Sequence, residues 1–188
     1  MSVGRTFEES LLKAVRSLEI GLYHLHHRVF DDMQEAQLLE YIRLGTDDRI
    51  YAIAELLRRG CSIEPIHEAT AIDRFFLRKI RNITEKEREL SESRGSASVL
   101  LSAKKFGFSD KEIAELWEMS EDEVFSIRKN ANIFPTYKMI DTCAGEFDSY
   151  VPYFYSTYGE ENESIVSSAK KVIVLGSGPI RIGQGVEF

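Results

Sequence analysis

The sharpest pattern for chemistry in this sequence is a glycine-rich segment near its C-terminal end, Leu175–Gly185 (LGSGPIRIGQG). The apolar run KVIVL precedes it, and a buried strand that enters a Gly-x-Gly turn is how nucleotide-binding α/β units begin, since glycine lets backbone amides approach phosphate. However, Arg181 stands where the dinucleotide fingerprint has its third glycine, and Pro179 removes a backbone donor. These departures favour a tight structural turn over phosphate binding by this loop alone.

Residues 109–130 (SDKEIAELWEMSEDEVFSIRKN) have the spacing of a helix-turn-helix. In DNA-binding proteins of this kind, the N-terminal residues of the second helix contact the bases. Here that end reads Glu-Asp-Glu at 121–123, which repels phosphate, and only Arg128 and Lys129 at the far end would attract it. The pattern favours ordinary helix packing, and a DNA-binding regulator is the alternative interpretation.

Histidine and cysteine side chains offer further chemistry, but none forms a complete pattern. His24, His26 and His27 lie close together, yet no cysteine or carboxylate stands at a recognised metal-ligand spacing nearby, which favours a loop or interface role. Cys143 has no histidine close in sequence to activate it as a nucleophile. The sequence therefore predicts no catalytic residue and no metal or cofactor ligand.

The elements that must position these residues change character near residues 134–135. Before that point apolar residues recur at helical spacing, and a serine or threonine three residues before a glutamate marks helix starts at Thr6, Ser109 and Ser120. Further helices are expected at about 32–44, 47–59, 71–90 and 96–106, with a short helix after Pro65. In the helix expected at 71–90, the apolar stripe is Ile72, Phe75, Phe76, Lys79 and Ile83, and the tail EKEREL reads as a solvated face.

After that point the chain is expected to be extended. Residues 137–140 could form one strand, the aromatic-rich segment 150–158 surrounds a proline, and residues 171–175 have the apolar character of a buried strand. The predicted fold class is mainly α. An irregular all-α domain (1–133) precedes an extended connector (134–168) and the first strand and glycine-rich loop of an incomplete α/β domain (169–188).

Composition excludes several functional classes. The 188 residues include 24 Lys and Arg against 31 Asp and Glu, and this net charge of −7 argues against a protein whose main partner is nucleic acid. No apolar run approaches the roughly 18 residues of a membrane span, and the first residues lack a signal-peptide layout. Two cysteines make no disulfide framework. We therefore expect a cytoplasmic protein with no membrane partner.

Six blocks in a fixed order carry a resemblance to a known family. They are GRTFEESLLKAVRSLEIG, IDRFFLRKI, AKKFGFSDKEIA, YKMIDTCAGEF, PYFYSTY and VIVLGSGPIRIGQGVEF, and they extend from about residue 3 to residue 188. In this order they closely resemble the middle of the carbamoyl-phosphate synthase large subunit. In that family a helical oligomerisation domain joins two homologous ATP-grasp halves.

The resemblance implies a function for the whole enzyme and a smaller one for this segment. The whole enzyme would make carbamoyl phosphate from bicarbonate, glutamine-derived ammonia and two ATP, for arginine and pyrimidine biosynthesis. It would use ATP with Mg²⁺ or Mn²⁺ and a glutaminase small subunit. The segment itself is expected to bind no cofactor, to be non-catalytic alone, to link the two ATP-grasp halves and to self-associate.

Two sets of residues are candidates for these roles. In the family, the RIGQGVEF loop lies near the internal passage that carries carbamate between the active sites, which makes Arg181, Gln184, Gly185 and Glu187 candidates for shaping it. A self-association surface needs exposed apolar side chains on short helices. The candidates for that surface are Phe75, Phe76, Trp117 and Phe125.

Overall fold

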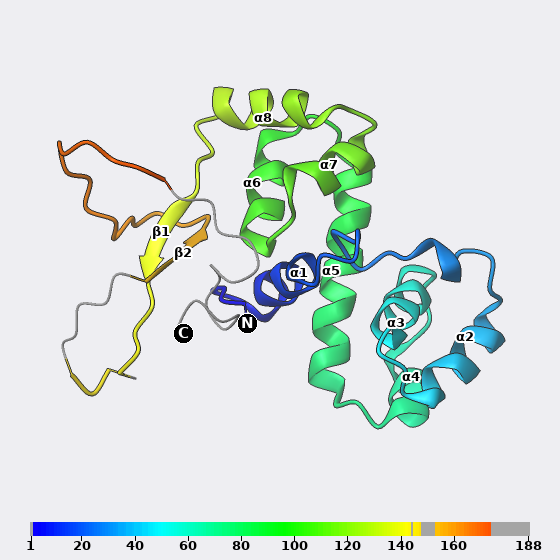
Figure 1. Cartoon of the computed structure of the whole chain (residues 1–188). Helices are drawn as coiled ribbons and strands as arrows, with labels where there is room; N and C mark the ends of the chain where they lie inside the picture. Colours follow the sequence, from blue (N-terminus) through cyan, green and yellow to red (C-terminus); the bar gives the residue numbers. More distant parts are fainter. Residues whose placement is uncertain (1, 144, 148–152, 174–188) are drawn as a thin grey trace.

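The computed structural model describes residues 2–143, 145–147 and 153–173, and this part of the chain is mainly helical, as predicted (Figure 1). Two short 3-10 helices, η1 (Arg28–Phe30) and η2 (Ile42–Leu44), flank α2. The α-helices are α1 (Phe7–Ser17), α2 (Glu35–Tyr41), α3 (Arg49–Arg58), α4 (Ile63–Thr70), α5 (Arg74–Glu92), α6 (Ala97–Phe106), α7 (Asp110–Trp117) and α8 (Glu121–Asn130). No helix in these ranges combines the length and apolar character needed to cross a membrane.

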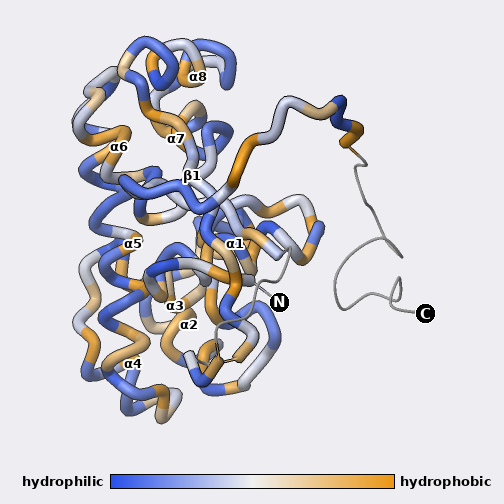
Figure 2. The backbone as a smooth tube through the Cα atoms, turned by 90° about the vertical axis from the view of Figure 1, so that its left-hand side faces the viewer, coloured by the Kyte–Doolittle hydropathy of each residue, from blue (hydrophilic) through white to orange (hydrophobic). Residues whose placement is uncertain are grey.

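Helix α5 is the axis of the helical part. It contacts α1, α3, α4, α6 and α7, and in Figure 1 the group α6–α8 lies at its upper end while α2–α4 lie at its lower end. Figure 2 shows the same order from another side, with hydrophobic residues recurring along the helices. The residues of α5 that enter this core lie three or four positions apart, as one face of a helix requires. They are Leu77, Ile80, Ile83, Thr84, Glu87 and Leu90.

This buried face differs from the predicted one. Phe75 and Phe76, which were placed in the apolar stripe and were also candidates for the association surface, are 47% and 44% exposed. In the tail that was expected to be solvated, Glu87 and Leu90 are buried. The predicted stripe and the solvated tail were therefore wrong in part. The first turn of α5 carries a second apolar stripe beside the main one, and periodicity alone does not show which stripe meets the neighbouring helices.

The predicted helix starts at Thr6, Ser109 and Ser120 are confirmed. In each case the hydroxyl accepts a hydrogen bond from the backbone N–H three residues later, at 3.1, 3.1 and 3.3 Å. At Ser120 the carboxylate of Glu123 also accepts from the Ser120 N–H at 2.8 Å, which completes a capping box. At Ser109 the matching carboxylate, that of Glu112, is fully buried instead and is available for another role.

Gly107 ends α6 with φ +98°, a conformation that glycine adopts without cost. A Cβ there would lie 2.8 Å from the Cα of Glu9 in α1, whereas a Cβ on Gly60 (φ +90°) would meet nothing within 4 Å. We expect Gly60→Ala to cost about 1 kcal/mol from the left-handed backbone. Gly107→Ala should cost about 2–3 kcal/mol because overpacking is added. Urea unfolding of both variants measures the difference, and equal losses would contradict a close approach of α1 and α6.

The connector begins with an antiparallel hairpin of β1 (Thr136–Met139) and β2 (Phe154–Thr157). Thr136 pairs with Thr157 and Met139 with Phe154, so the predicted strand near 137–140 is confirmed and the aromatic segment supplies its partner. The Lys13 ammonium of α1 donates to the Ser156 carbonyl at 2.5 Å, which ties the hairpin to the helical part. The predicted strand at 171–175 is not seen at 171–173, and the rest of it lies outside the described residues.

Candidate functional site

Two of the predicted surface residues form an exposed aromatic patch with a third ring. Phe75 and Phe76 lie at the start of α5, and Phe7 lies at the start of α1. The ring of Phe76 is 5.3 Å from that of Phe75 and 5.4 Å from that of Phe7, and Phe7 and Phe75 meet edge to face at 6.3 Å. We call Phe7, Phe75 and Phe76 the aromatic patch.

Local hydrogen bonds hold the patch in place. The Asp73 carboxylate accepts from the Phe75 N–H at 2.7 Å and so fixes the first turn of α5. The Glu8 carboxylate of α1 accepts from Asn82 at 2.9 Å and from Lys79 at 3.2 Å, both on α5. Burial raises the pKa of Glu8, but these hydrogen bonds outweigh it and lower the pKa overall. The patch therefore stands on two helices that are fixed to each other.

The other two candidates for this surface lie elsewhere. Phe125 is 44% exposed on α8, with the Arg128 guanidinium 5.0 Å from its ring centroid, and α8 lies at the opposite end of α5 from the patch (Figure 1). Trp117 is 1% exposed, and its indole N–H donates to the Leu90 carbonyl at 2.7 Å. The prediction for Trp117 was wrong because α7 packs on α5 with this side chain between them.

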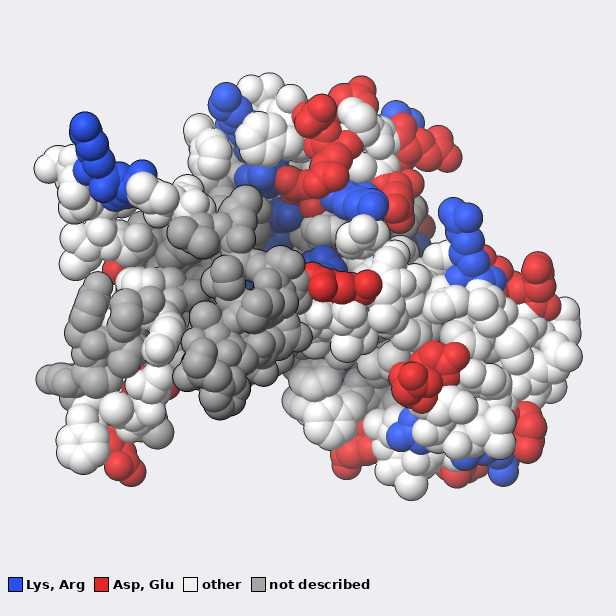
Figure 3. Space-filling view, in the orientation of Figure 1, with Lys and Arg blue, Asp and Glu red and all other residues white. Residues whose placement is uncertain are grey.

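The candidates for the internal passage, Arg181, Gln184, Gly185 and Glu187, lie outside the described residues, and their role stays a prediction. The α7–α8 hairpin does form, but Arg128 is buried and its guanidinium donates to Asp110, so it is not available to phosphate. Acidic side chains gather near this end of the molecule in Figure 3. These features count against the DNA-binding alternative.

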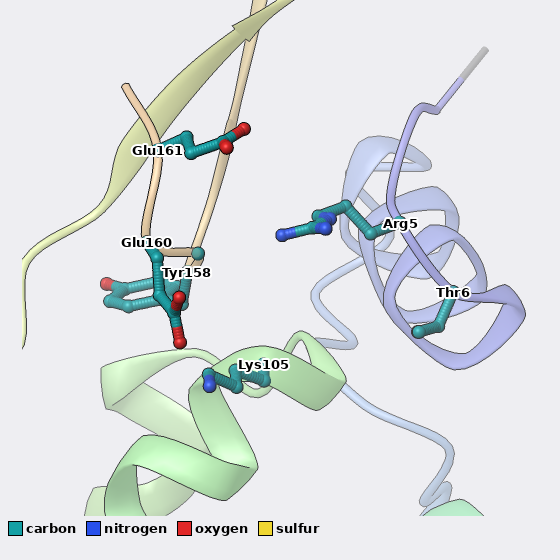
Figure 4. Close-up of a pocket in the computed structure, with 7 residues that line it drawn as sticks. Arg5, Thr6, Lys105, Tyr158, Glu160 and Glu161 are labelled. Carbon is teal, nitrogen blue, oxygen red and sulfur yellow. The ribbon is translucent and has the colours of Figure 1, made fainter. Parts of the chain in front are cut away.

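A hollow of about 510 Å³ lies where the connector meets the helical part (Figure 4). Arg5 precedes α1, Lys105 lies in the last turn of α6, and the opposite wall comes from the segment after β2. Glu160 and Glu161 lie on that wall, on the other side of the hollow from the two cations. Because both signs of charge line it, the arrangement suits a contact between the two parts of the chain better than selection of an anion.

Sequence reasoning missed a buried polar cluster. His24 precedes η1, Glu87 lies on α5 and Glu112 on α7, yet the His24 Nδ1 atom is 4.0 Å from Glu87 and 3.7 Å from Glu112. The signal in the sequence was a glutamate at a core position of α5, between Ile83 and Leu90. By contrast Cys61 and Cys143 are free thiols that are partly exposed.

Comparison with known protein families gives a match over most of the chain. Residues 1–132 match the family model described as the carbamoyl-phosphate synthetase large chain, oligomerisation domain. This range contains helices α1–α8 and the aromatic patch.

Proposed function

Because the chain belongs to the family of the carbamoyl-phosphate synthetase large-chain oligomerisation domain, we propose that its helical part self-associates through the aromatic patch. The observation that carries this proposal is the exposure of Phe75 and Phe76, 47% and 44%, on a rigid pair of helices. Aromatic side chains are enriched at protein interfaces because they bury a large area at low entropic cost. A second copy of the chain is the partner that the family description favours.

In the whole enzyme, the segment would link the two ATP-grasp halves. The halves would bind ATP with Mg²⁺ or Mn²⁺, and a glutaminase small subunit would supply ammonia. With bicarbonate and two ATP, the enzyme would make carbamoyl phosphate for arginine and pyrimidine biosynthesis in the cytoplasm. The family match over residues 1–132 supports an architectural role for the helical part. The loop residues Arg181, Gln184, Gly185 and Glu187 would shape the internal passage, as the resemblance of their segment implies.

The double substitution Phe75→Glu with Phe76→Glu tests the association surface. We expect the unchanged chain to form a dimer or larger species that dissociates on dilution. The variant should weaken association at least about 30-fold, because losing an interface hot spot costs at least about 2 kcal/mol. Light scattering behind size exclusion, over a concentration series, measures both.

Three single variants test whether the loss of self-association is specific to the aromatic patch. Phe134→Glu is the matched control, since Phe134 is 50% exposed beyond the end of α8, and it should associate as the unchanged chain does. Phe125→Glu and Leu44→Glu test two other exposed apolar positions, 44% and 70% exposed. A monomeric unchanged chain, or dissociation by Leu44→Glu or Phe125→Glu while the double variant still associates, would contradict the proposal. Circular dichroism checks that each variant is folded.

A further inference from the structure

Three side chains from distant parts of the sequence meet inside the helical part. One donor atom from each of His24, Glu87 and Glu112 lies within 4.8 Å of the other two. The side chains are 14%, 6% and 0% exposed, so the cluster is almost closed to solvent. It joins the segment before η1 to α5 and α7.

Four atoms of this cluster are buried with no hydrogen-bond partner. They are His24 Nδ1, Glu87 Oε1 and both carboxylate oxygens of Glu112. Buried polar atoms are nearly always paired, and leaving one unpaired costs about 1–3 kcal/mol, more when it is charged. Since carboxylate oxygens offer only electron pairs, they cannot satisfy one another. A cation between them would satisfy several at once.

We propose that His24 Nδ1, Glu87 Oε1 and a carboxylate oxygen of Glu112 form a binding site for one divalent transition-metal ion such as Zn²⁺. Zinc takes histidine nitrogen and carboxylate oxygen at about 2.0–2.2 Å in tetrahedral geometry, which places its ligand atoms about 3.4 Å apart. The distances from His24 Nδ1, 3.7 and 4.0 Å, need to shrink by only a few tenths of an ångström. The second oxygen of Glu112 or a water would fill the fourth position.

The surrounding groups orient these ligands as the outer shell of a metal site does. The Nε2 atom of His24 faces the Glu115 carboxylate at 3.7 Å, so a proton on Nε2 would have an acceptor within reach when Nδ1 binds the ion. The second oxygen of Glu87 accepts from the Arg58 Nε–H at 2.9 Å and lies 2.8 Å from the Nη2 atom of the same guanidinium. Glu87 and Arg58 also border a surface hollow of about 290 Å³.

A second cluster with similar spacing shows why distance alone does not define the site. His26, Asp31 and Glu55 also bring donor atoms within 4.8 Å. There the His26 ring contacts Asp31 at 2.7 Å, and the two Glu55 oxygens accept from Arg58 and Arg59 at 2.5 and 2.6 Å. The polar atoms of that cluster already have partners within the protein, so it does not need a metal ion. His26 is therefore the control for His24.

The competing occupant is a proton. Burial and the nearby Glu87 carboxylate raise the pKa of Glu112 well above its ordinary value, which would keep its carboxyl group neutral in the absence of a cation. If the cluster is a metal site, titration with zinc should show binding. If a proton on Glu112 satisfies the cluster instead, the titration should show none. The outcome does not depend on whether the chain self-associates.

The test uses the full chain without a polyhistidine tag, treated with a chelator and then titrated with Zn²⁺ in a calorimeter. We expect one zinc per chain, confirmed by elemental analysis after desalting, and a higher melting temperature with zinc. His24→Ala and Glu112→Gln should each weaken binding at least about 100-fold, since even loss of an outer-shell partner costs about 10–100-fold. His26→Ala should bind as the unchanged chain does.

Glu112→Gln keeps the shape of the side chain, so it separates loss of the ligand from loss of the fold, which circular dichroism monitors. Co²⁺ gives a second measure, because a tetrahedral site yields visible absorption bands that Glu112→Gln should abolish. Failure of the unchanged chain to bind either ion one to one would overturn the proposal. Equal zinc binding by His24→Ala, Glu112→Gln and the unchanged chain would overturn it as well.

Discussion

Replacing Asp110 with alanine should destabilise the chain by about 3–5 kcal/mol, the usual cost of leaving a buried charge without its partner. Asp110 is the shared anion of two buried cations. Its carboxylate accepts from the Lys104 ammonium at 2.8 Å and from the Arg128 guanidinium at 3.0 and 3.1 Å. The three side chains are 15%, 6% and 9% exposed, so the two cations would be left largely shielded from water.

The two cations are held where they are. Lys104 also donates to the Phe108 carbonyl at 2.7 Å, and Arg128 donates to the Ile133 carbonyl at 3.0 Å. Burial raises the pKa of Asp110, but the two cations outweigh it and lower the pKa overall. Burial lowers the pKa of Lys104 despite Asp110, because this ammonium is more deeply buried and also faces Arg128. The cluster therefore favours the charged form of Asp110 more than it favours the charged form of Lys104.

The stability lost in Asp110→Ala should depend on pH. Because the pKa of Asp110 is lower in the folded than in the unfolded chain, its stabilisation is present above the unfolded value of about 3.9 and disappears as the pH falls through the folded value. Urea unfolding at neutral pH and at a series of acidic values should show the unchanged chain and Asp110→Ala converging as the pH falls.

Asp32 provides the matched control. It is an exposed aspartate outside the helices, and Asp32→Ala should change the free energy of unfolding by less than about 0.5 kcal/mol at every pH. A loss of under 1 kcal/mol for Asp110→Ala at neutral pH would show that the cluster does not support the fold in the way described.

Replacing Trp117 with alanine should cost about 3–5 kcal/mol, because it removes a large buried side chain and leaves a cavity between α7 and α5. Trp117 is 1% exposed. Its N–H donates to the Leu90 carbonyl near the end of α5, which also accepts from the Ser93 N–H at 3.0 Å. Trp117→Phe keeps most of the ring contact and should cost about 0.5–1.5 kcal/mol, chiefly from the lost hydrogen bond.

Since the sequence contains one tryptophan, far-UV circular dichroism in urea should follow the unfolding rather than fluorescence. Phe125→Ala is the control, because this ring is 44% exposed and its removal should cost less than about 1 kcal/mol. An unchanged unfolding midpoint for Trp117→Ala would contradict its place in the core.

The sequence by itself determined the features that depend on near neighbours. The helix starts at Thr6, Ser109 and Ser120 were predictable because the hydrogen bond that makes each of them spans three residues. The strand near 137–140 was predictable from its local apolar character. The ordered blocks identified the family because their order, unlike the chemistry of any one block, needs no knowledge of contacts.

The tertiary structure decided which apolar and ionic side chains are buried. Phe75 and Trp117 looked alike in the sequence, but Trp117 is buried where α7 packs on α5, whereas Phe75 is exposed. His24 lies far from Glu87 and Glu112 along the chain, and no spacing rule connects a loop, α5 and α7. Burial depends on which faces meet when helices pack, and that choice is made by the whole set of contacts rather than by any one segment.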